Sequence, residues 1–416
     1  MNKVVVVGAG PAGMMAAGIA SQAGARVELL EKGARVGRKL AITGKGRCNI
    51  TTAVPAEELV YAYPGNGKFL HSAFAAFSNH DLIKFLSQRG LETKIERGMR
   101  VFPVSNDAHE VVQLFESFAR EQGAVIRTST AVKGLAVEAG VIQGVYTQQG
   151  LLKADAVIIT TGGLSYPGTG STGDGYKWAR ELGHTIITPQ PGLVPLITAE
   201  KWVKELRGLS LKNVSASSFR ADGSKINEEF GEMLFTHFGI SGPIILTMSR
   251  DIRHYLDQEK SPVKLEIDLK PALDEERLDL RLQRDLNKYS RKMFKNALYD
   301  LLPRKFIPII IDLSGIQAEK ACHQITREER MQLVYLLKHV PLTIVGTRPI
   351  SEAIVTAGGV DTREINPATM QSRLVKGLYF AGEILDVDGY TGGYNLQAAF
   401  STGYLAGKDA AGRRLT

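Results

Sequence analysis

The first 31 residues constrain the fold more than any other part of the chain. Val4 to Val7 is a short run of β-branched residues that leads into GAGPAG at residues 8–13. Met14 to Gln22 has helical character, and Ala25 to Leu30 is a second apolar segment that ends at Glu31. A GxGxxG turn between a strand and a helix, followed by a second strand with a terminal acid, is typical of a dinucleotide-binding βαβ unit.

Each glycine of this turn has a mechanical role. Gly8 permits the tight exit from the strand, Gly10 lets a pyrophosphate approach the backbone, and Gly13 lets the helix pack close to the strand. The phosphates would lie at the positive end of the helix, where backbone N–H groups are unpaired. Glu31, 18 residues after Gly13, is placed to accept hydrogen bonds from ribose hydroxyls.

The same stretch also has to be considered as a membrane segment. Val4 to Ala25 carries no charge and is long enough to span a bilayer. However, five glycines and Pro11 interrupt it, and Lys3 is the only basic residue before it. We therefore expect neither a signal peptide nor a membrane anchor.

Composition indicates a cytoplasmic protein of two domains. The chain has 416 residues, and only Cys48 and Cys322 are cysteines, so no disulfide framework is implied. No CxxC or HExxH spacing occurs, and we expect no metal site. The net charge of +8 could indicate a nucleic-acid partner or phosphate-bearing cofactors, but it is spread along the chain, which favours a plain basic surface. We expect a small-molecule substrate. The oligomeric state stays open.

After the βαβ unit, a basic glycine-rich loop at residues 37–51 contains Arg38 and Lys39. Residues 69–90 and 108–123 have helical apolar spacing. Residues 125–150 read as three short strands at hairpin spacing, which predicts a meander before a final apolar strand that ends in Gly162-Gly163. A glycine at the carboxyl end of a strand again permits a ligand to approach the backbone.

Pro189, Pro191 and Pro195 break this pattern, and we place a domain boundary there. From 192 to 269 the segments are short and strand-like, including EMLFTHFGISGPIIL at 232–246. A helical, charge-rich stretch follows from Pro271 to about Lys305, for which a solvated helical face is the favoured interpretation over an RNA-binding surface. Residues 333–344 are predicted as a strand that closes this second domain.

The C-terminal region returns to the first sheet. Residues 377–382 form a predicted strand that ends at Gly382, directly before Glu383, and Gly392-Gly393 opens a predicted helix over 394–406. Two strand ends with acids and two helix starts are what an extended FAD requires, with the adenosine at the first turn and the flavin at the second helix. A helix N-terminus near flavin N1 and O2 would stabilise the anionic reduced ring.

Five segments together resemble the BaiN-like (YhiN-type) family of FAD-dependent oxidoreductases: GRKLAITGKGRCN, YPGTGSTGDGY, LFTHFGISGP, VTAGGV and GLYFAGEILDVDGYTGGYN. The resemblance covers essentially the whole chain. It implies an α/β fold with a Rossmann-like FAD domain of glutathione-reductase type at 1–190 and 345–416. A β-barrel insert at 191–344 would interrupt it, with a helical subdomain at about 271–330. The implied FAD contacts are Ala12, Glu31, Arg38, Lys39, the backbone of Val132, Glu383, Asn395 and Leu396.

The family includes an aminoacetone oxidase and a bile-acid reductase, so the resemblance does not specify the substrate. No second GxGxxG lies in a βαβ unit, and NAD(P)H would therefore bind only transiently, or the organic substrate would itself supply the electrons. We expect an FAD-dependent oxidoreductase in which flavin N5 exchanges hydride with a small organic substrate or NAD(P)H. No catalytic acid or base is assigned, although Tyr166, His237 and Tyr390 could reach the ring. The alternatives are a flavoprotein acting on tRNA and a flavin-binding regulator without turnover.

Overall fold

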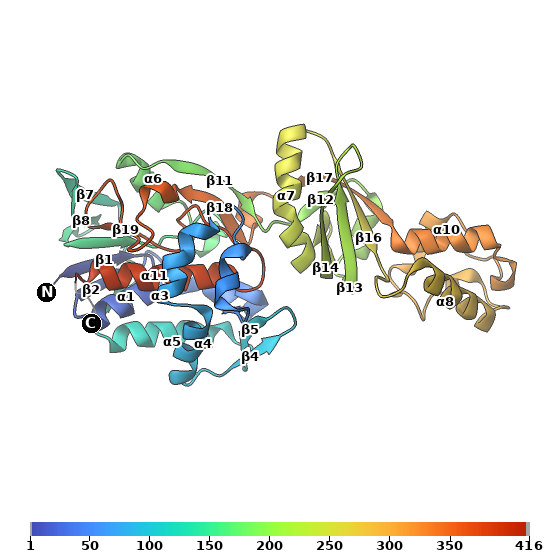
Figure 1. The fold of residues 1–416 in the computed structure, drawn as a ribbon, viewed down its shortest axis with the longest axis horizontal. Helices are drawn as coiled ribbons and strands as arrows, with labels where there is room; N and C mark the ends of the chain where they lie inside the picture. The colour runs from blue at the N-terminus through green and yellow to red at the C-terminus, as the bar shows by residue number, and fades with distance from the viewer. Residues whose placement is uncertain (1, 413–416) are drawn as a thin grey trace. The chain divides into compact units, whose positions relative to one another are not determined.

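The computed structural model describes residues 2–412. The chain divides into two compact units (Figure 1). One unit combines Met1–Gly192 with Ile350–Thr416, and the other is the intervening segment Leu193–Pro349. The first is called the nucleotide unit below, and the second the insert unit.

A five-stranded parallel sheet forms the centre of the nucleotide unit, in the order β19-β10-β1-β2-β6. Four of the five residues of β1 and of β2, and all residues of β10 and β19, are buried. Such continuous apolar runs are expected where helices or loops cover both faces of a parallel sheet. The strands are β1 (Lys3–Val7), β2 (Arg26–Leu30), β6 (Val125–Arg127), β10 (Ala156–Ile159) and β19 (Leu378–Phe380).

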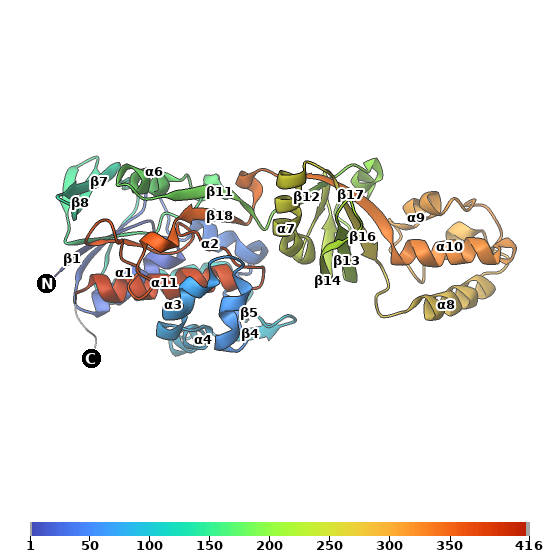
Figure 2. The ribbon, with the colours of Figure 1, turned by 45° about the horizontal axis from the view of Figure 1, so that its top comes forward.

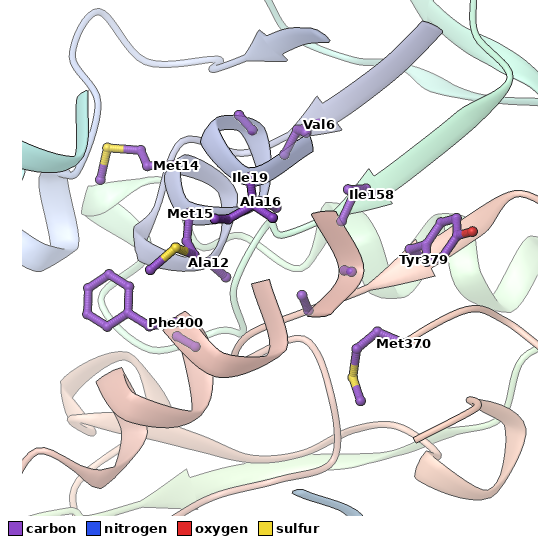
Figure 3. Close-up of a cluster of buried hydrophobic side chains, with 14 of the residues drawn as sticks. Val6, Ala12, Met14, Met15, Ala16, Ile19, Ile158, Met370, Tyr379 and Phe400 are labelled. Carbon is purple, nitrogen blue, oxygen red and sulfur yellow. The ribbon is translucent and has the colours of Figure 1, made fainter. Parts of the chain in front are cut away.

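Two helices pack in parallel against this sheet, α1 (Pro11–Gln22) and α11 (Tyr394–Ala410) (Figure 2). A Cβ atom on Gly403 would lie 2.4 Å from the carbonyl oxygen of Ala12, and one on Gly407 would lie 2.4 Å from that of Ala16. The two backbones are therefore in close contact over a full turn. Figure 3 shows the apolar side chains of α1 around this contact, together with Phe400 of α11 and Ile158 of β10.

In the described part of the chain, the remaining elements of the nucleotide unit include five α-helices and three small antiparallel sheets. Asp107 accepts the His109 N–H at the start of α5, and Ser78 and Asp81 form a capping box on α4. The sheet orders are β3-β5-β4, β7-β8-β9 and β11-β18. The helices are α2 (Arg38–Ile42), α3 (His71–Ala76), α4 (Asn79–Gln88), α5 (Ala108–Glu121) and α6 (Asp174–Glu181). The strands are β3 (Thr51–Thr52), β4 (Thr93–Glu96), β5 (Arg100–Pro103), β7 (Gly134–Glu138), β8 (Val141–Thr147), β9 (Gly150–Lys153), β11 (Ile186–Gly192) and β18 (Val355–Val360).

The insert unit contains a closed six-stranded barrel, in the order β12-β15-β14-β13-β16-β17. Alternating burial along β16 directs its apolar side chains into the barrel. The strands are β12 (Leu196–Thr198), β13 (Ser210–Phe219), β14 (Lys225–Phe235), β15 (Gly239–Ser241), β16 (Val263–Asp268) and β17 (Val340–Thr347). Within this unit α7 (Pro243–Glu259) packs beside the barrel, and α8 (Glu275–Lys288), α9 (Ile307–Ser314) and α10 (Arg327–Lys338) gather at the opposite end (Figure 2).

Four predictions of local structure are wrong. Residues 333–338 belong to helix α10, and the strand starts only at Val340, because Thr326 and Glu329 form a capping box that starts a helix. The segment 232–246 contains the end of β14, then β15 and the start of α7, which has Pro243 in its first turn. The helical stretch from 271 ends at Lys288. The first predicted hairpin strand is β6 of the parallel sheet, so the meander consists of β7, β8 and β9.

Candidate functional site

The first βα turn leaves open space beside one glycine. A Cβ atom on Gly8 would lie 2.7 Å from the Thr160 carbonyl oxygen, and one on Gly13 would lie 1.9 Å from that of Gly8. These two glycines are therefore required by packing, and Gly8 also has a positive φ of 102°. A Cβ atom on Gly10 would meet no atom within 4 Å. Gly10 is also the N-cap of α1 and provides no side-chain cap, so the Ala12 and Gly13 N–H groups face this space without intrahelical acceptors.

Glu31 connects this turn to the loop that follows β2. Its Oε2 accepts the N–H of Ala9 at 2.9 Å, and its Oε1 accepts the N–H of Gly33 at 2.7 Å. Each carboxylate oxygen can accept a further hydrogen bond. The Thr130 N–H donates to the Glu31 carbonyl oxygen at 2.8 Å, which places the chain leading to Val132 alongside Glu31. Val132 is partly buried and lies in the connection before β7, outside the meander strands.

Arg38 and Lys39 are neighbours in α2 but point to different places. The exposed Arg38 donates through Nη2 to the carbonyl oxygen of Gly168 at 2.7 Å. The half-buried Lys39 donates through Nζ to Ser165 Oγ at 2.6 Å and to the Glu383 carboxylate at 2.7 and 3.0 Å. Lys39 thus belongs to an internal polar cluster, whereas Arg38 borders solvent.

This polar cluster collects groups from three strand ends. Besides Lys39, the Oε1 atom of Glu383 accepts the Ser165 hydroxyl at 2.8 Å and the Thr356 N–H at 2.9 Å. Thr356 Oγ1 in turn accepts the N–H groups of Leu164 and Ser165. Sequence reasoning named Lys39 and Glu383 but missed Ser165 and Thr356. The available signal was their position, since Thr356 lies inside the VTAGGV segment and Ser165 directly precedes YPGTG.

Gly162 and Gly382 both have positive φ, at 72° and 80°. A Cβ atom on Gly382 would lie 2.9 Å from Cβ of Ala12, so this glycine lets the end of β19 rest on the first turn of α1. Its N–H donates to Thr402 Oγ1 at 3.0 Å. A Cβ atom on Gly162 would meet Ser171 Oγ at 2.8 Å. Gly162 therefore serves the local turn and, unlike Gly10, has no open space beside it.

The start of α11 is held by the basic loop. Gly393 has φ of 96°, and a Cβ atom there would lie 2.4 Å from the Thr51 backbone. In the orientation that satisfies its neighbours, the Asn49 amide oxygen accepts the Gly393 N–H at 3.0 Å. The Asn395 side chain is engaged with Gly389, from which it accepts an N–H and to which it donates, both at 2.8 Å. The backbone N–H groups of Asn395 and Leu396 lie in the first helical turn, where no intrahelical acceptor exists.

The three residues considered for proton transfer lie in different surroundings. Tyr166 is half-buried with φ of 51°, and burial together with the nearby Glu352 carboxylate raises the pKa of its phenol. The Tyr390 N–H donates to the carbonyl oxygen of Ala62 at 3.0 Å. His237 lies between β14 and β15 of the insert unit, with its ring centroid 4.9 Å from that of Phe238.

A cavity of about 650 Å³ opens next to the loop after β2. Three of its lining side chains are arginines, against one glutamate that is paired with Arg120 at 2.8 Å. Arg38 is common to this cavity and to the predicted nucleotide contacts. The lining residues are Ala34, Arg35, Val36, Arg38, Ala41, Ile42, His109, Val112, Gln113, Glu116, Arg120, Thr128 and Thr169.

Two other kinds of site find no support in residues 2–412. No group of three or more His, Cys, Asp or Glu side chains is arranged there to hold a metal ion, and no helix is long and apolar enough to cross a membrane. Cys48, in the basic loop, is fully buried, and burial raises the pKa of its thiol to about 12. Such a thiol is a packing residue and not a redox nucleophile.

The model of the family described as HI0933-like protein Rossmann domain matches residues 2–409. The chain belongs to this family. This result confirms the resemblance drawn from the sequence. Proteins similar to this chain include 3-dehydro-bile acid delta(4,6)-reductase of Clostridium scindens, 33% identical over 99% of this chain and 100% of that protein. Ribosomal RNA dihydrouridine synthase of Haemophilus influenzae is 33% identical over 96% of both chains, and that of Escherichia coli is 31% identical over 97% of both.

Solved structures of similar fold include 3-ketosteroid-delta4-(5alpha)-dehydrogenase from Rhodococcus jostii. Its TM-score is 0.54 at 14% identity, covering 99% of this chain and 97% of that one. The open conformation of a flavocytochrome c3 fumarate reductase has a TM-score of 0.51 at 18% identity, covering 99% and 78%. At such low identity these likenesses concern the fold alone. Together with the parallel sheet and the closed barrel, they confirm the predicted fold class.

Proposed function

We propose that this protein is an FAD-dependent oxidoreductase. The observation that carries the proposal is the parallel packing of α1 and α11. Ala12 is the second residue of α1 and contacts Gly403, the tenth residue of α11. The start of α11 therefore extends about 12 Å beyond the start of α1, at a rise of 1.5 Å per residue. Two helix N-termini that point the same way with this offset suit a long dinucleotide held at both ends.

The residues between these two helix starts fit FAD. The space beside Gly10 and the free N–H groups of Ala12 and Gly13 suit its pyrophosphate. Glu31 has lone pairs left for the adenosine ribose, and the Val132 backbone would bind the adenine. Arg38 would add a cation to the phosphate region, and the Lys39–Glu383 pair would border the ribityl chain. The N–H groups of Asn395 and Leu396 would hold the flavin O2 side, and the positive end of α11 would stabilise negative charge there.

The relatives suggest the kind of bond that is reduced. A delta(4,6)-reductase of a 3-dehydro-bile acid and a dihydrouridine synthase both act, by their names, on a carbon–carbon double bond conjugated to a carbonyl group. When bound, FAD supplies hydride chemistry at N5. Reduction of such a bond adds hydride to one carbon and a proton to the other. Tyr166 is half-buried and directly follows Ser165 of the polar cluster, and its phenol is protonated at neutral pH, which makes it our candidate for the proton donor.

NAD(P)H is our proposed electron donor. The chain has one GxGxxG turn in a βαβ unit, so the nicotinamide nucleotide would bind only while it reduces the flavin. A small amine as the donor, with oxygen as the acceptor, is the alternative that a family containing an aminoacetone oxidase leaves open.

The test is anaerobic stopped-flow absorbance of the purified protein. We expect the oxidised-flavin band to be present, to bleach rapidly with NADH or NADPH, and to return when an electron acceptor is added. A 3-oxo-Δ4 steroid and a uridine-containing RNA are the two acceptors to compare. Bleaching by an amine alone would replace the reductase proposal with an oxidase. A protein that purifies without flavin and binds none would contradict the proposal as a whole.

A further inference from the structure

The insert unit carries a dense cluster of positive charge between α8 and α9. We call residues 288–305 the basic turn. It contains six cations, Lys288, Arg291, Lys292, Lys295, Arg304 and Lys305, and one acid, Asp300. Because the acids of α8 precede this segment, the charge-rich stretch from Pro271 to Lys305 separates into an acidic helix start and a basic turn.

Half of these cations are available to a partner. Lys288 is paired with Asp300 at 2.8 Å, and Lys295 with Glu319 at 3.2 Å. Lys305 donates to the Arg207 carbonyl oxygen. Arg291, Lys292 and Arg304 are exposed, and no carboxylate within residues 2–412 forms an ion pair with them. These three cations are free to pair with the phosphates of a partner.

Aromatic rings lie among the cations. The Nζ atoms of Lys288 and Lys292 are each 4.8 Å from the ring centroid of Tyr289. Tyr299 is 51% exposed, and the Arg304 guanidinium carbon is 5.8 Å from its ring centroid. Tyr289 is partly buried, whereas Tyr299 offers an exposed ring beside a cation, the combination with which proteins stack nucleobases and neutralise phosphates.

The backbone of the basic turn is fixed. The Phe294 N–H donates to the Lys320 carbonyl oxygen at 2.8 Å, and the Cys322 N–H donates to that of Lys292 at 3.0 Å. The His323 N–H donates to the Ser290 carbonyl oxygen at 3.1 Å, and Phe294 is fully buried. The charges are thus presented on an ordered scaffold, which lowers the entropy cost of binding.

We propose that the basic turn is a docking surface for single-stranded or looped RNA, and that RNA is the substrate of the enzyme. This inference rests on the proposed function, since it names the substrate of the proposed reductase. A single-stranded nucleic acid fits better than inorganic polyphosphate or an acidic protein because it combines phosphates for Arg291, Lys292 and Arg304 with an unstacked base for Tyr299. The names of two relatives agree with this substrate class.

The test compares two triple variants of the full-length protein that lose the same charge. R291A/K292A/R304A removes the unpaired cations of the basic turn. K201A/K204A/K212A removes three other exposed cations of the insert unit that form no ion pair within the described chain. Fluorescence anisotropy with a labelled, uridine-rich single-stranded RNA measures Kd at several salt concentrations. We expect the first variant to bind RNA at least tenfold more weakly. The slope of log K against log salt should fall by about 2, because each of the three lost phosphate contacts contributes about 0.7. The second variant should keep the wild-type slope.

Tyr299 provides an independent readout. Tyr299→Ala should weaken RNA binding about fivefold or more, whereas Tyr299→Phe should bind as the wild type does, because stacking needs only the ring. Equal weakening by both triple variants, an unchanged salt slope in the first, or equally tight binding of inorganic polyphosphate would overturn the proposal. Flavin content and NAD(P)H reduction, measured on the same samples, report on the proposed function separately. Loss of flavin would contradict that function, while normal flavin reduction without RNA binding would contradict only the docking surface.

Discussion

The Nζ atom of Lys39 lies 2.7 Å from Oε2 of Glu383, although 344 positions separate the two residues in sequence. The ion pair joins the basic loop after β2 to the end of β19, and side-chain exposures of 21% and 22% keep it partly out of water. Since the same carboxylate also accepts bonds from Ser165 and Thr356, a single group holds together four segments of the nucleotide unit.

Replacing Lys39 by methionine should lower the free energy of unfolding of the flavin-free protein by about 2 kcal/mol, because a hydrogen-bonded charged pair is lost while Glu383 stays half-buried. Urea unfolding measures the change. Lys32→Met is the matched control, since the Lys32–Asp174 pair is exposed at 35% and 41% and should contribute no more than about 1 kcal/mol. Equal losses in the two variants would show that the internal pair has no special role.

Alanine substitutions at Gly10 and Gly13 should change different properties: the first should weaken FAD binding, and the second should destabilise the fold. Gly10→Ala places its Cβ in open space at an ordinary φ of −81°. The free energy of unfolding of the flavin-free variant should therefore stay within about 0.5 kcal/mol of the wild-type value. Its FAD affinity should fall at least tenfold, because the methyl group fills the proposed pyrophosphate space.

Gly13→Ala forces its Cβ to within 1.9 Å of the Gly8 carbonyl oxygen and should destabilise the fold by about 3 kcal/mol or more. Thermal unfolding and flavin titration of both variants separate the two effects. Full FAD binding by Gly10→Ala would contradict the proposed pyrophosphate position.

His184 should make stability depend on pH. Its ring is buried, and burial lowers its pKa, with Glu364 opposing this effect. Ser372 Oγ accepts the N–H groups of Leu374 and Val375, so its hydroxyl donates to Nε2 of His184, and Nδ1–H donates to Glu364. Both ring nitrogens are therefore satisfied only in the neutral form.

With the native pKa below the unfolded value of about 6.5, the unfolded state takes up the proton first as the pH falls. Stability should therefore decrease below about pH 6.5, by at most about 1.4 kcal/mol per pH unit from this group, until the native pKa is reached. Urea unfolding between pH 7.5 and about pH 5 should show a shallower decrease for His184→Gln than for the wild type. The exposed His80→Gln should keep the wild-type slope. Identical slopes in all three proteins would refute the assignment.

Neither cysteine should react in the folded protein. Cys48 and Cys322 are buried, and burial raises the pKa of both thiols. Titration with an aromatic disulfide reagent at pH 8 should detect no thiol in the native protein and two in urea. Fast labelling of Cys48 in the native protein would reopen a redox role for the basic loop.

The sequence predicts the βαβ unit and the C-terminal strand and helix well because their signals are local. Glycine spacing, β-branched runs and terminal acids lie within a few residues of one another, and each identifies its element. The apolar run Leu333–Leu337 has no such unambiguous signal, since it suits a buried strand as well as a helix. The capping box at Thr326 decides for the helix, and it lies upstream of the run.

The polar cluster was only partly predictable for a different reason. Lys39 and Glu383 stand out as charged residues in glycine-rich motifs, whereas Ser165 and Thr356 are ordinary hydroxyl residues. Their importance comes from contacts across 191 and 218 positions. A single sequence carries no record of such contacts, because they depend on which strands become neighbours in the sheet.

The pairing of β11 with β18 has an evolutionary consequence. Gly192, where the chain leaves the nucleotide unit, is paired with Val355, just after the chain returns, and inside the insert unit the Arg348 N–H donates to the Pro195 carbonyl oxygen. The two ends of the insert thus lie side by side. A single genetic event could therefore exchange the insert for another module while the strand pairing of the nucleotide unit stays unchanged.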